Sequence, residues 1–436
     1  MRTRSTASAA LLLALAACAA GPDPDAGLAA APTPASRAPA PPCTPGNGGI
    51  TLPAGFCAIV FADTLAGVRH LAVAPNGDVY AARAGRRDGP AGSALALRDT
   101  DNDGDADLVQ AFGTLGGSGI EIAGDWLYFG ANDQVVRWRL QPGQLVPAGS
   151  PEVIVGGLPV GGHAAKGIAL DGRGNLFVSI GSRTNSCQVA DRQNASPGED
   201  PCQELAVRAG VWRFDANRPN QAQADGERWA TGIRNGMAIA WHAGEGVPFT
   251  VSHGRDQLFQ NWGSSFTEAQ NDELPSEEMF RLARGTDGGW PYCFHDRAAG
   301  RKVLAPEYGG DGRQVGGRCQ DKAAPVVAFP AHWAPNDLLF YTGSSFPARY
   351  RGGAFVAFHG SWNRTRQQGY NVVFVPFQGG RPAGQFEVFA DGFAPNPSDQ
   401  QSRRRPTGLA MGPDGSLYVA DDARGRIWRI VYTGQR

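Results

Sequence analysis

Short stretches of alternating apolar residues recur along the chain, each followed by a turn rich in Gly, Asp, Asn or Pro and then by a second apolar stretch. Residues 71–80 (LAVAPNGDVY) form one copy, and residues 409–419 (LAMGPDGSLYV) are nearly the same. Residues 168–178 form a third copy. The alternation is typical of half-buried strands, and the turn residues predict tight hairpins. The pattern therefore predicts a chain built from repeated β-hairpins.

Weaker copies of the hairpin begin near Ile120, Met237 and Leu338. The six starts spread over roughly 340 residues, about 68 per unit, which is long for a propeller blade but compatible with large loops. No helical period of useful length accompanies them. A β-propeller protects its sheet edges by repetition around a ring. We therefore predict an all-β, six-bladed β-propeller with long loops on one face (residues 181–235 and 254–335), in which the segment near Ile59 completes the last blade.

The first residues have the features of an export signal. Arg2 and Arg4 precede a short apolar core that ends at Cys18, in a sequence resembling a bacterial lipobox. We predict a lipoprotein-type signal over residues 1–18 with Cys18 lipidated, a disordered Ala/Pro-rich tether over 19–42, and the propeller over 43–436. The alternative is an ordinary signal that discards Cys18. No other apolar run could cross a bilayer, so a periplasmic or cell-envelope location is predicted, with membrane contact only through the lipid anchor.

Six cysteines follow Cys18, and an even count in an exported chain predicts disulfides. Six cysteines allow fifteen pairings, of which local pairing is the simplest. No Cys-x-x-Cys spacing indicates a metal or redox site. The predicted bridges are Cys43–Cys57, Cys187–Cys202 and Cys293–Cys319.

Composition and charge narrow the class. The chain has 60 Gly and 32 Pro among 436 residues, which argues against a helix bundle. A net charge of −1 implies no nucleic-acid partner and no acidic surface as partner. Residues 99–107 (DTDNDGDAD) begin like a calcium loop, but Gln110 stands where an EF-hand needs Glu. We predict a solvated acidic hairpin, with a weak calcium site as the alternative.

His163 lies in a glycine-rich turn just ahead of the predicted strand at residues 168–170. A histidine held at the start of a rigid strand is well placed to act as a base in a pocket. The alternative is a turn histidine that only hydrogen-bonds a neighbouring loop.

Taken in order, these segments resemble the soluble pyrroloquinoline-quinone (PQQ) sugar dehydrogenases, in particular their sorbosone dehydrogenase-like branch. The resemblance covers residues 50 to 432, and that family is a six-bladed propeller. It implies that His163 is the general base that takes the proton of an aldose anomeric hydroxyl. The glucose dehydrogenases have an orienting Asp nineteen residues further on, where this chain has Ser182, which cannot stabilise an imidazolium as a carboxylate would.

The resemblance also implies a cofactor site. PQQ carries three carboxylates, and arginine suits their recognition. Arg234 and Asn235 match the family's pair over the cofactor, and Arg405 matches a carboxylate-binding arginine. Thr407 stands where the family has a second arginine, and Arg364 lies near a cofactor-contacting lysine of the family.

The family binds Ca²⁺ partly through two consecutive main-chain carbonyls. The matching turn is Gly254-Arg255, with Arg in place of Pro, and the acidic segment with Asp272 and Glu273 follows it. Hard oxygen ligands suit calcium. The implied cofactors are therefore PQQ and Ca²⁺.

The predicted function is a PQQ- and calcium-dependent dehydrogenase acting on an aldose or a sorbosone-like aldehyde. Its implied partners are a small sugar and a quinone or other periplasmic electron acceptor. Two alternatives stay open, because the fold alone does not decide function. One is a calcium-dependent lactonase, and the other is a non-catalytic propeller that binds a glycan or a protein.

Overall fold

The computed structural model describes residues 41–65, 67–85, 92–315, 317–398 and 403–434. The predicted signal, Cys18 and nearly all of the predicted tether lie outside the described residues. Among the described residues, no helix is both long enough and apolar enough to span a membrane. The three predicted disulfides are present and are typical of a protein that matures in an oxidising compartment.

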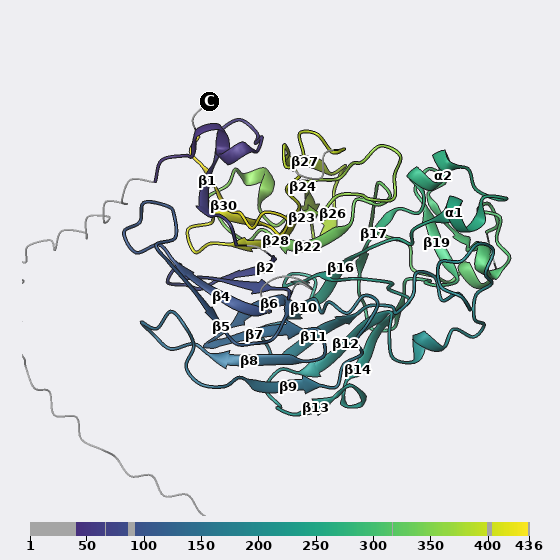
Figure 1. Cartoon of the computed structure of the whole chain (residues 1–436), viewed down its shortest axis with the longest axis horizontal. Coiled ribbons are helices and arrows are strands. Elements are labelled where there is room, and N and C mark those ends of the chain that lie inside the picture. Colours follow the sequence, from purple (N-terminus) through teal and green to yellow (C-terminus); the bar gives the residue numbers. More distant parts are fainter. Residues whose placement is uncertain (1–40, 66, 86–91, 316, 399–402, 435–436) are drawn as a thin grey trace, which may run out of the picture. The chain divides into compact units, whose positions relative to one another are not determined.

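Six blades of four antiparallel strands make up the described ring, each with its strands in sequence order apart from the closing strand (Figure 1). Two of these sheets gain a short fifth strand that pairs in parallel, and two separate sheets have two strands each. The first strand of each sheet begins at or near one of the six predicted hairpin starts, so the six-bladed propeller is confirmed. The first three blades are β2 (Val68–Val73), β3 (Val79–Arg83), β4 (Ser93–Arg98), β5 (Leu108–Phe112); β6 (Gly117–Ala123), β7 (Trp126–Ala131), β8 (Val135–Arg139), β9 (Glu152–Gly156); and β10 (Ile168–Leu170), β11 (Asn175–Ile180), β12 (Gly210–Asp215), β14 (Glu227–Thr231).

The last blade is closed by the first strand of the described chain. Strand β1 (Phe56–Ala62) pairs antiparallel with β30, with Ile59 opposite Arg429, as predicted from the sequence. Figure 1 shows β1 in purple beside β30 in yellow. Blades four to six are β15 (Ala238–His242), β16 (Val247–Ser252), β17 (Glu277–Arg281), β21 (Val327–Phe329); β22 (Pro335–Phe340), β23 (Ala354–Phe358), β24 (Asn371–Val375), β27 (Glu387–Ala390); and β28 (Pro406–Met411), β29 (Leu417–Asp421), β30 (Ile427–Tyr432) with β1.

The core consists of apolar layers between neighbouring blades. One buried cluster joins blades one and two through side chains such as Tyr80 and Phe129, and another joins blades five and six through Phe355 and Trp428. Corresponding clusters lie at the other four blade contacts. Because each sheet buries both faces in this way, the ring is held by apolar burial on every side.

The first strands of all six blades surround the central channel. They line a cavity of about 530 Å³ that extends toward the ends of these strands, near His242 and Met411. The opposite end of the channel lies where the first strands begin. Because strands within a blade alternate in direction, the loops that precede each first strand and follow each second strand meet at this end.

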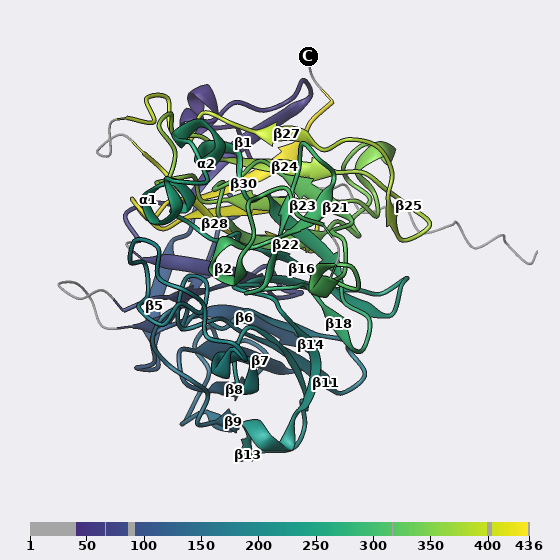
Figure 2. The same ribbon diagram turned by 90° about the vertical axis from the view of Figure 1, so that its right-hand side faces the viewer.

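The two segments predicted as long loops also contain blade strands. β12, β14 and β17 carry charged residues among their apolar ones, as in Glu277-Glu278, and this obscures the alternation in the sequence. The fourth of these strands, β21, has only three residues. The remainder of the second segment forms a small unit beside the blades, around its own apolar cluster (Figures 1 and 2). The elements outside the blades are α1 (Leu258–Trp262), α2 (Glu268–Glu273), β13 (Gln221–Ala222), β18 (Thr286–Asp287), β19 (Cys293–Asp296), β20 (Arg301–Leu304), β25 (Phe377–Gln378), β26 (Arg381–Pro382) and six 3-10 turns, η1 (Pro45–Gly49), η2 (Gln203–Ala206), η3 (Gln223–Asp225), η4 (Pro306–Tyr308), η5 (Gly317–Cys319) and η6 (Ala348–Tyr350).

The acidic segment at residues 99–107 connects β4 to β5, as the predicted hairpin requires. Carboxylate oxygens of Asp99, Asp101 and Asp107 lie within 4.8 Å of one another, and this is the one such group of three among the described residues. It lies on outer strands, away from the channel.

Candidate functional site

His163 is held in a defined tautomer at the channel end where the first strands begin. Its Nδ1 lies 2.9 Å from the main-chain oxygen of Ser182 and 3.0 Å from the Ser182 hydroxyl. A carbonyl oxygen can only accept, so Nδ1 carries the proton and donates it. The Ser182 hydroxyl donates its own proton to the Thr184 carbonyl at 2.7 Å. In the neutral ring, Nε2 therefore keeps its lone pair, as a general base requires.

Burial keeps this imidazole neutral. Burial, with a smaller effect from the Arg234 charge, lowers the pKa of His163 to about 3. Within the described part of the chain, Nε2 has no hydrogen-bond partner. The ring can therefore accept a proton from a bound molecule without first losing one.

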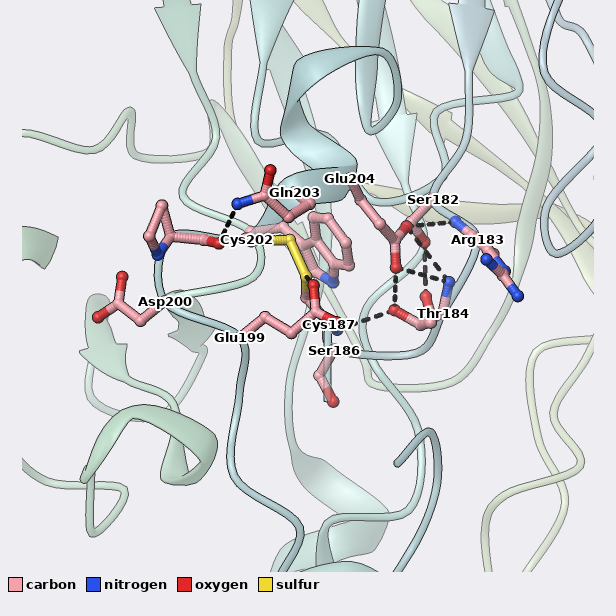
Figure 3. Close-up of a disulfide and its surroundings, with 12 residues drawn as sticks. Ser182, Arg183, Thr184, Ser186, Cys187, Glu199, Asp200, Cys202, Gln203 and Glu204 are labelled. Atoms are coloured by element: carbon pink, nitrogen blue, oxygen red, sulfur yellow. Dashed lines mark hydrogen bonds between the residues drawn. A yellow bond between two sulfur atoms is a disulfide. The ribbon is translucent and has the colours of Figure 1, made fainter. Parts of the chain in front are cut away.

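The loop that carries Ser182 is fixed by Glu204 and by a disulfide (Figure 3). Glu204, in η2, accepts hydrogen bonds from the main-chain N–H of Arg183 at 2.5 Å and of Thr184 at 3.2 Å, and from the Thr184 hydroxyl. The Cys187–Cys202 bridge joins this loop to the residue before η2. The position of the Ser182 carbonyl, and with it the ring of His163, is set by these contacts.

Arg234 lies beside this loop and is almost fully buried, at 3 % exposure. Its main-chain oxygen accepts from Ser182 N–H at 2.7 Å. Its guanidinium donates to the carbonyls of Asn185 at 2.9 Å and Gly254 at 2.7 Å, and it pairs with Asp256 at 3.2 Å. The loops of blades three and four are therefore joined through this one side chain.

Asp256 is shared by three basic side chains. Besides Arg234 it contacts Arg192 at 3.3 Å and His332 at 3.6 Å. Burial alone would raise the pKa of Asp256, but the hydrogen bond from His332 and the Arg234 charge hold it well below its usual range. Burial alone would lower the pKa of His332, but Asp256 outweighs burial and raises it. The backbones of Arg192 and His332 are left-handed (φ 58° and 64°), a strained conformation that concentrates at functional sites.

Arg405 occupies the other side of the channel end. It donates to the carbonyls of His359 at 2.9 Å and Gly360 at 2.7 Å. His359 Nε2 contacts Asp422 at 2.8 Å, and Asp422 pairs with Arg69 at 2.5 Å. Burial lowers the pKa of His359 to about 4.

His253 lies between the two sides. Burial, with smaller effects from Arg234 on one side and His359 on the other, lowers the pKa of His253 to about 3. Its main-chain N–H donates to the Asn235 carbonyl at 2.9 Å. The predicted residues His163, Ser182, Arg234, Asn235 and Arg405 therefore lie around one end of the channel.

The site has unmet hydrogen-bonding capacity and positive charge. Among the described residues, the buried atoms Asn235 Oδ1, His253 Nε2 and Arg69 Nε have no hydrogen-bond partner. Buried polar atoms are rarely left unpaired in proteins, so these atoms indicate a polar ligand. Four arginines, Arg69, Arg192, Arg234 and Arg405, stand against the carboxylates of Asp256 and Asp422. This donor set fits PQQ, whose carboxylates and quinone oxygens need cations and donors.

Arg364, Asp272 and Glu273 form a separate contact. Arg364 donates to the Asp272 carbonyl and pairs with Glu273 at 2.5 Å, and the Asp272 carboxylate accepts from Thr365. Thr407 is fully buried, and its hydroxyl contacts the carbonyls of Val68 at 3.2 Å and Ala420 at 3.3 Å. These side chains are engaged with the protein and not with the cluster around His163.

The residues expected to hold calcium do not form one site in this arrangement. The Gly254 carbonyl already accepts a hydrogen bond from Arg234, and the Arg255 side chain is buried in an ion pair with Glu307 at 2.5 Å. The Asp272 and Glu273 carboxylates contact Thr365 and Arg364 instead. In this arrangement the Gly254 carbonyl and both carboxylates are engaged with other groups of the protein, and calcium binding by these residues stays a prediction.

Several members of the cluster escaped the sequence-based prediction. Asp256 directly follows the Gly254-Arg255 turn and could have been found from that turn. Asp422 follows β29 in the last repeat, two strands from Arg405. His332 and Arg69 carry no motif, because their place in the site depends on how distant loops meet.

Comparison with known proteins supports the fold and the resemblance. The chain is 25 % identical over 301 residues to an uncharacterized protein of Borreliella burgdorferi, covering 68 % of this chain and 65 % of that protein. It is also 25 % identical over 291 residues to a PQQ-dependent pyranose dehydrogenase of Coprinopsis cinerea, covering 59 % of this chain and 38 % of that protein. The chain thus spans less than two thirds of either relative.

Solved structures share the fold. The holo PQQ domain of Coprinopsis cinerea pyranose dehydrogenase superposes with a TM-score of 0.71 at 20 % identity, covering 88 % of this chain and 97 % of that one. The soluble aldose sugar dehydrogenase of Escherichia coli gives a TM-score of 0.58 at 16 % identity, covering 86 % and 99 %. The predicted resemblance to soluble PQQ sugar dehydrogenases is confirmed. The TrAA12-like family profile matches residues 50–433, almost the whole described propeller, and the chain belongs to this family.

Proposed function

We propose that this protein is a PQQ-dependent dehydrogenase that oxidises the anomeric hydroxyl of an aldose, with His163 as the general base. The observation that carries the proposal is the fixed tautomer of His163, whose Nε2 lone pair is free beside a cluster of arginines. The pyranose dehydrogenase and the aldose sugar dehydrogenases named above support an oxidoreductase acting on sugars.

Arg234, Asn235 and Arg405 would hold the cofactor, together with Arg69 and His253. When bound, PQQ would supply the two-electron acceptor for the hydride that leaves C1 of the sugar. His163 Nε2 would take the proton of the C1 hydroxyl, and the product would be a lactone. The Ser182 carbonyl keeps the proton on Nδ1, so that the transferred proton can go only to Nε2.

The low pKa of His163 matters for this role. The imidazole stays unprotonated in mildly acidic surroundings, so the base is ready at any physiological pH. Its conjugate acid gives the proton up readily, and Ser182 offers no carboxylate to stabilise the imidazolium. We therefore propose a base that is weak but always available.

The remaining parts of the proposal come from the sequence. Electrons would pass to a quinone or another periplasmic acceptor, and Cys18 would anchor the protein in the cell envelope. The calcium requirement stays a prediction of the family resemblance. In a lactonase, side-chain carboxylates around the channel would hold the metal. Among the described residues, the one group of three that could do so is on the β4–β5 hairpin, so no observation favours that function.

Reconstitution tests the proposal. Purified apoprotein is titrated with PQQ, with and without Ca²⁺, and dye reduction is then measured on a panel of aldoses. We expect PQQ-dependent reduction with at least one aldose, and its loss in His163→Ala. Failure to bind PQQ under both conditions would overturn the proposal.

A further inference from the structure

Trp362 is an exposed tryptophan on a rigid support. All ten tryptophans lie in the described residues, and Trp362 alone among them is exposed, at 55 %. Its neighbours Ser361 and Asn363 are buried. The Ser361 carbonyl accepts from the Tyr370 hydroxyl at 2.7 Å, and the Asn363 carbonyl accepts from Asn271 at 3.1 Å. Exposing so large an apolar side chain is unfavourable, so a fixed, exposed indole indicates a binding surface.

The loop of Trp362 is attached to the candidate site. Arg405 donates to the carbonyls of His359 and Gly360, just before Trp362. On the other side, the guanidinium carbon of Arg192 lies 5.9 Å from the centroid of the indole ring. Arg192 also pairs with Asp256 at 3.3 Å, and Asp256 pairs with Arg234. A single arginine therefore separates the exposed indole from the cluster around His163.

The chemistry of this surface suits a sugar ring. A pyranose has an apolar face of C–H groups and a rim of hydroxyls, so it can lie on an aromatic ring and hydrogen-bond to charged side chains at the same time. The charged group beside the indole is the guanidinium of Arg192. A lipid chain or an apolar protein partner would take this guanidinium out of water without offering it a hydrogen-bond acceptor, whereas sugar hydroxyls accept hydrogen bonds.

From these observations we propose that Trp362 is a stacking platform for the pyranose ring of the substrate, with Arg192 as a hydrogen-bond donor to its hydroxyls. The inference rests on the proposed function, because it places the sugar of that reaction. It predicts that the site binds cyclic sugars, whose C–H face covers the indole, more tightly than acyclic polyols and small aldehydes.

The test measures sugar binding to the apoprotein by ligand-observed NMR, without PQQ. The ligands are a set of aldopyranoses, with the acyclic polyol sorbitol as the control ligand. The variants are Trp362→Ala and Trp362→Phe, and Trp126→Phe serves as a control because Trp126 lies in β7, in a different blade. For wild type we expect pyranose C–H protons to receive saturation from the protein, and sorbitol to bind much more weakly.

Trp362→Ala should raise the dissociation constant of the pyranose about tenfold or more, the usual effect of truncating a central aromatic anchor. The dissociation constant of Trp362→Phe should lie between those of wild type and Trp362→Ala, and that of Trp126→Phe should equal the wild-type value. In the PQQ-loaded enzyme, Trp362→Ala should raise KM and leave kcat within about threefold, as expected for lost uniform binding.

Unchanged pyranose affinity in Trp362→Ala, or equal binding of sorbitol and pyranose, would overturn the inference. Because the NMR titration needs no PQQ, it is separate from the proposed function. Trp362-dependent pyranose binding without PQQ binding would reject the dehydrogenase and keep the sugar platform. PQQ-dependent activity that Trp362→Ala does not change would support the dehydrogenase and reject the sugar platform.

Discussion

The guanidinium of Arg234 donates to the main-chain carbonyl of Gly254 across 2.7 Å. This oxygen is one of the two that the family resemblance assigns to calcium. Because the positively charged guanidinium lies against it, we expect Arg234 and Ca²⁺ to compete for this oxygen. The same arginine is expected to hold PQQ, and its removal should affect the two ligands in opposite directions.

Arg234→Ala should weaken PQQ binding by about 1.5–3 kcal/mol, the range of a charge-assisted hydrogen bond. It should also tighten Ca²⁺ binding, because the Gly254 carbonyl becomes free. Calorimetric titration of chelator-treated apoprotein with each ligand measures both effects. Arg173→Ala, an exposed residue in the β10–β11 hairpin, is the control. Parallel loss of both affinities would contradict the competition.

His163→Ala should lower kcat by about 10²–10⁴, the range of general-base catalysis, while PQQ affinity survives. The pKa of His163 lies near 3, so the base is unprotonated across the neutral range. Activity of the wild type should therefore not fall through the usual histidine range as the pH drops from 7 to 5. A kcat profile measured between pH 4 and pH 8 checks this, and an acid limb near pH 6.5 would contradict it.

Ser182→Ala should have only a small effect on kcat, within about tenfold, because the main-chain carbonyl of Ser182 still accepts the Nδ1 proton. Ser182→Asp should raise the pKa of His163 by stabilising the imidazolium. NMR titration of the His163 ring compares the two variants. If Ser182→Ala abolished activity, the hydroxyl and not the carbonyl would orient the ring.

Glu204→Ala should lower kcat although Glu204 contacts neither PQQ nor the sugar, because Glu204 holds the main-chain amides of Arg183 and Thr184 next to Ser182. We expect a loss of about tenfold, with PQQ affinity unchanged, which is the mark of a positioning residue. Glu204→Gln keeps an acceptor oxygen and should recover part of the activity. The measurements are the separate changes in kcat and in KM, together with the pH dependence of kcat. A fall in kcat matched by loss of folded protein would instead show a purely structural role.

Stability should fall in mild acid because of a buried histidine away from the site. Burial lowers the pKa of His295 to about 4. Between pH 6.5 and pH 4 the histidine binds a proton in the unfolded state but not in the folded state. The free energy of unfolding therefore decreases as the pH is lowered, by up to about 1.4 kcal/mol per pH unit. Below pH 4 this contribution changes no further. Denaturant unfolding of wild type and His295→Gln at pH 7 and pH 5 should show a smaller pH effect in the variant.

Much of the fold was visible in the sequence because the hairpin of the first two strands recurs from blade to blade. The copies at residues 71–80 and 409–418 match at five of ten positions, including the Pro and Gly of the turn, so the repeat could be recognised without a structure. The outer strands were missed where charge interrupts them, as in β17, whose Glu277 and Glu278 are buried against hydrogen-bond donors and Lys302. The alternation of apolar and polar residues in the sequence does not show that a charged side chain is buried beside a partner.

The candidate site was visible only in part, for a related reason. His163 and Ser182 are nineteen residues apart and flank the hairpin of β10 and β11, so a local motif captures both. Asp256 and Arg192 are 64 residues apart and meet only because the loops of two blades turn toward each other. Thr407 and Arg364 have family counterparts at the cofactor, yet in this chain their side chains contact the protein itself.

The pairing of β1 with β30 has a consequence for how the protein is made. β1, the first strand of the described residues, finds its partner only when β30 has been made, since Phe56 lies opposite Tyr432. Until then β29 keeps an open edge, which is a template for unwanted pairing. A chain cut short before residue 427 would lack β30 and could not close its ring. The ring can therefore close only after the whole chain up to β30 has been made.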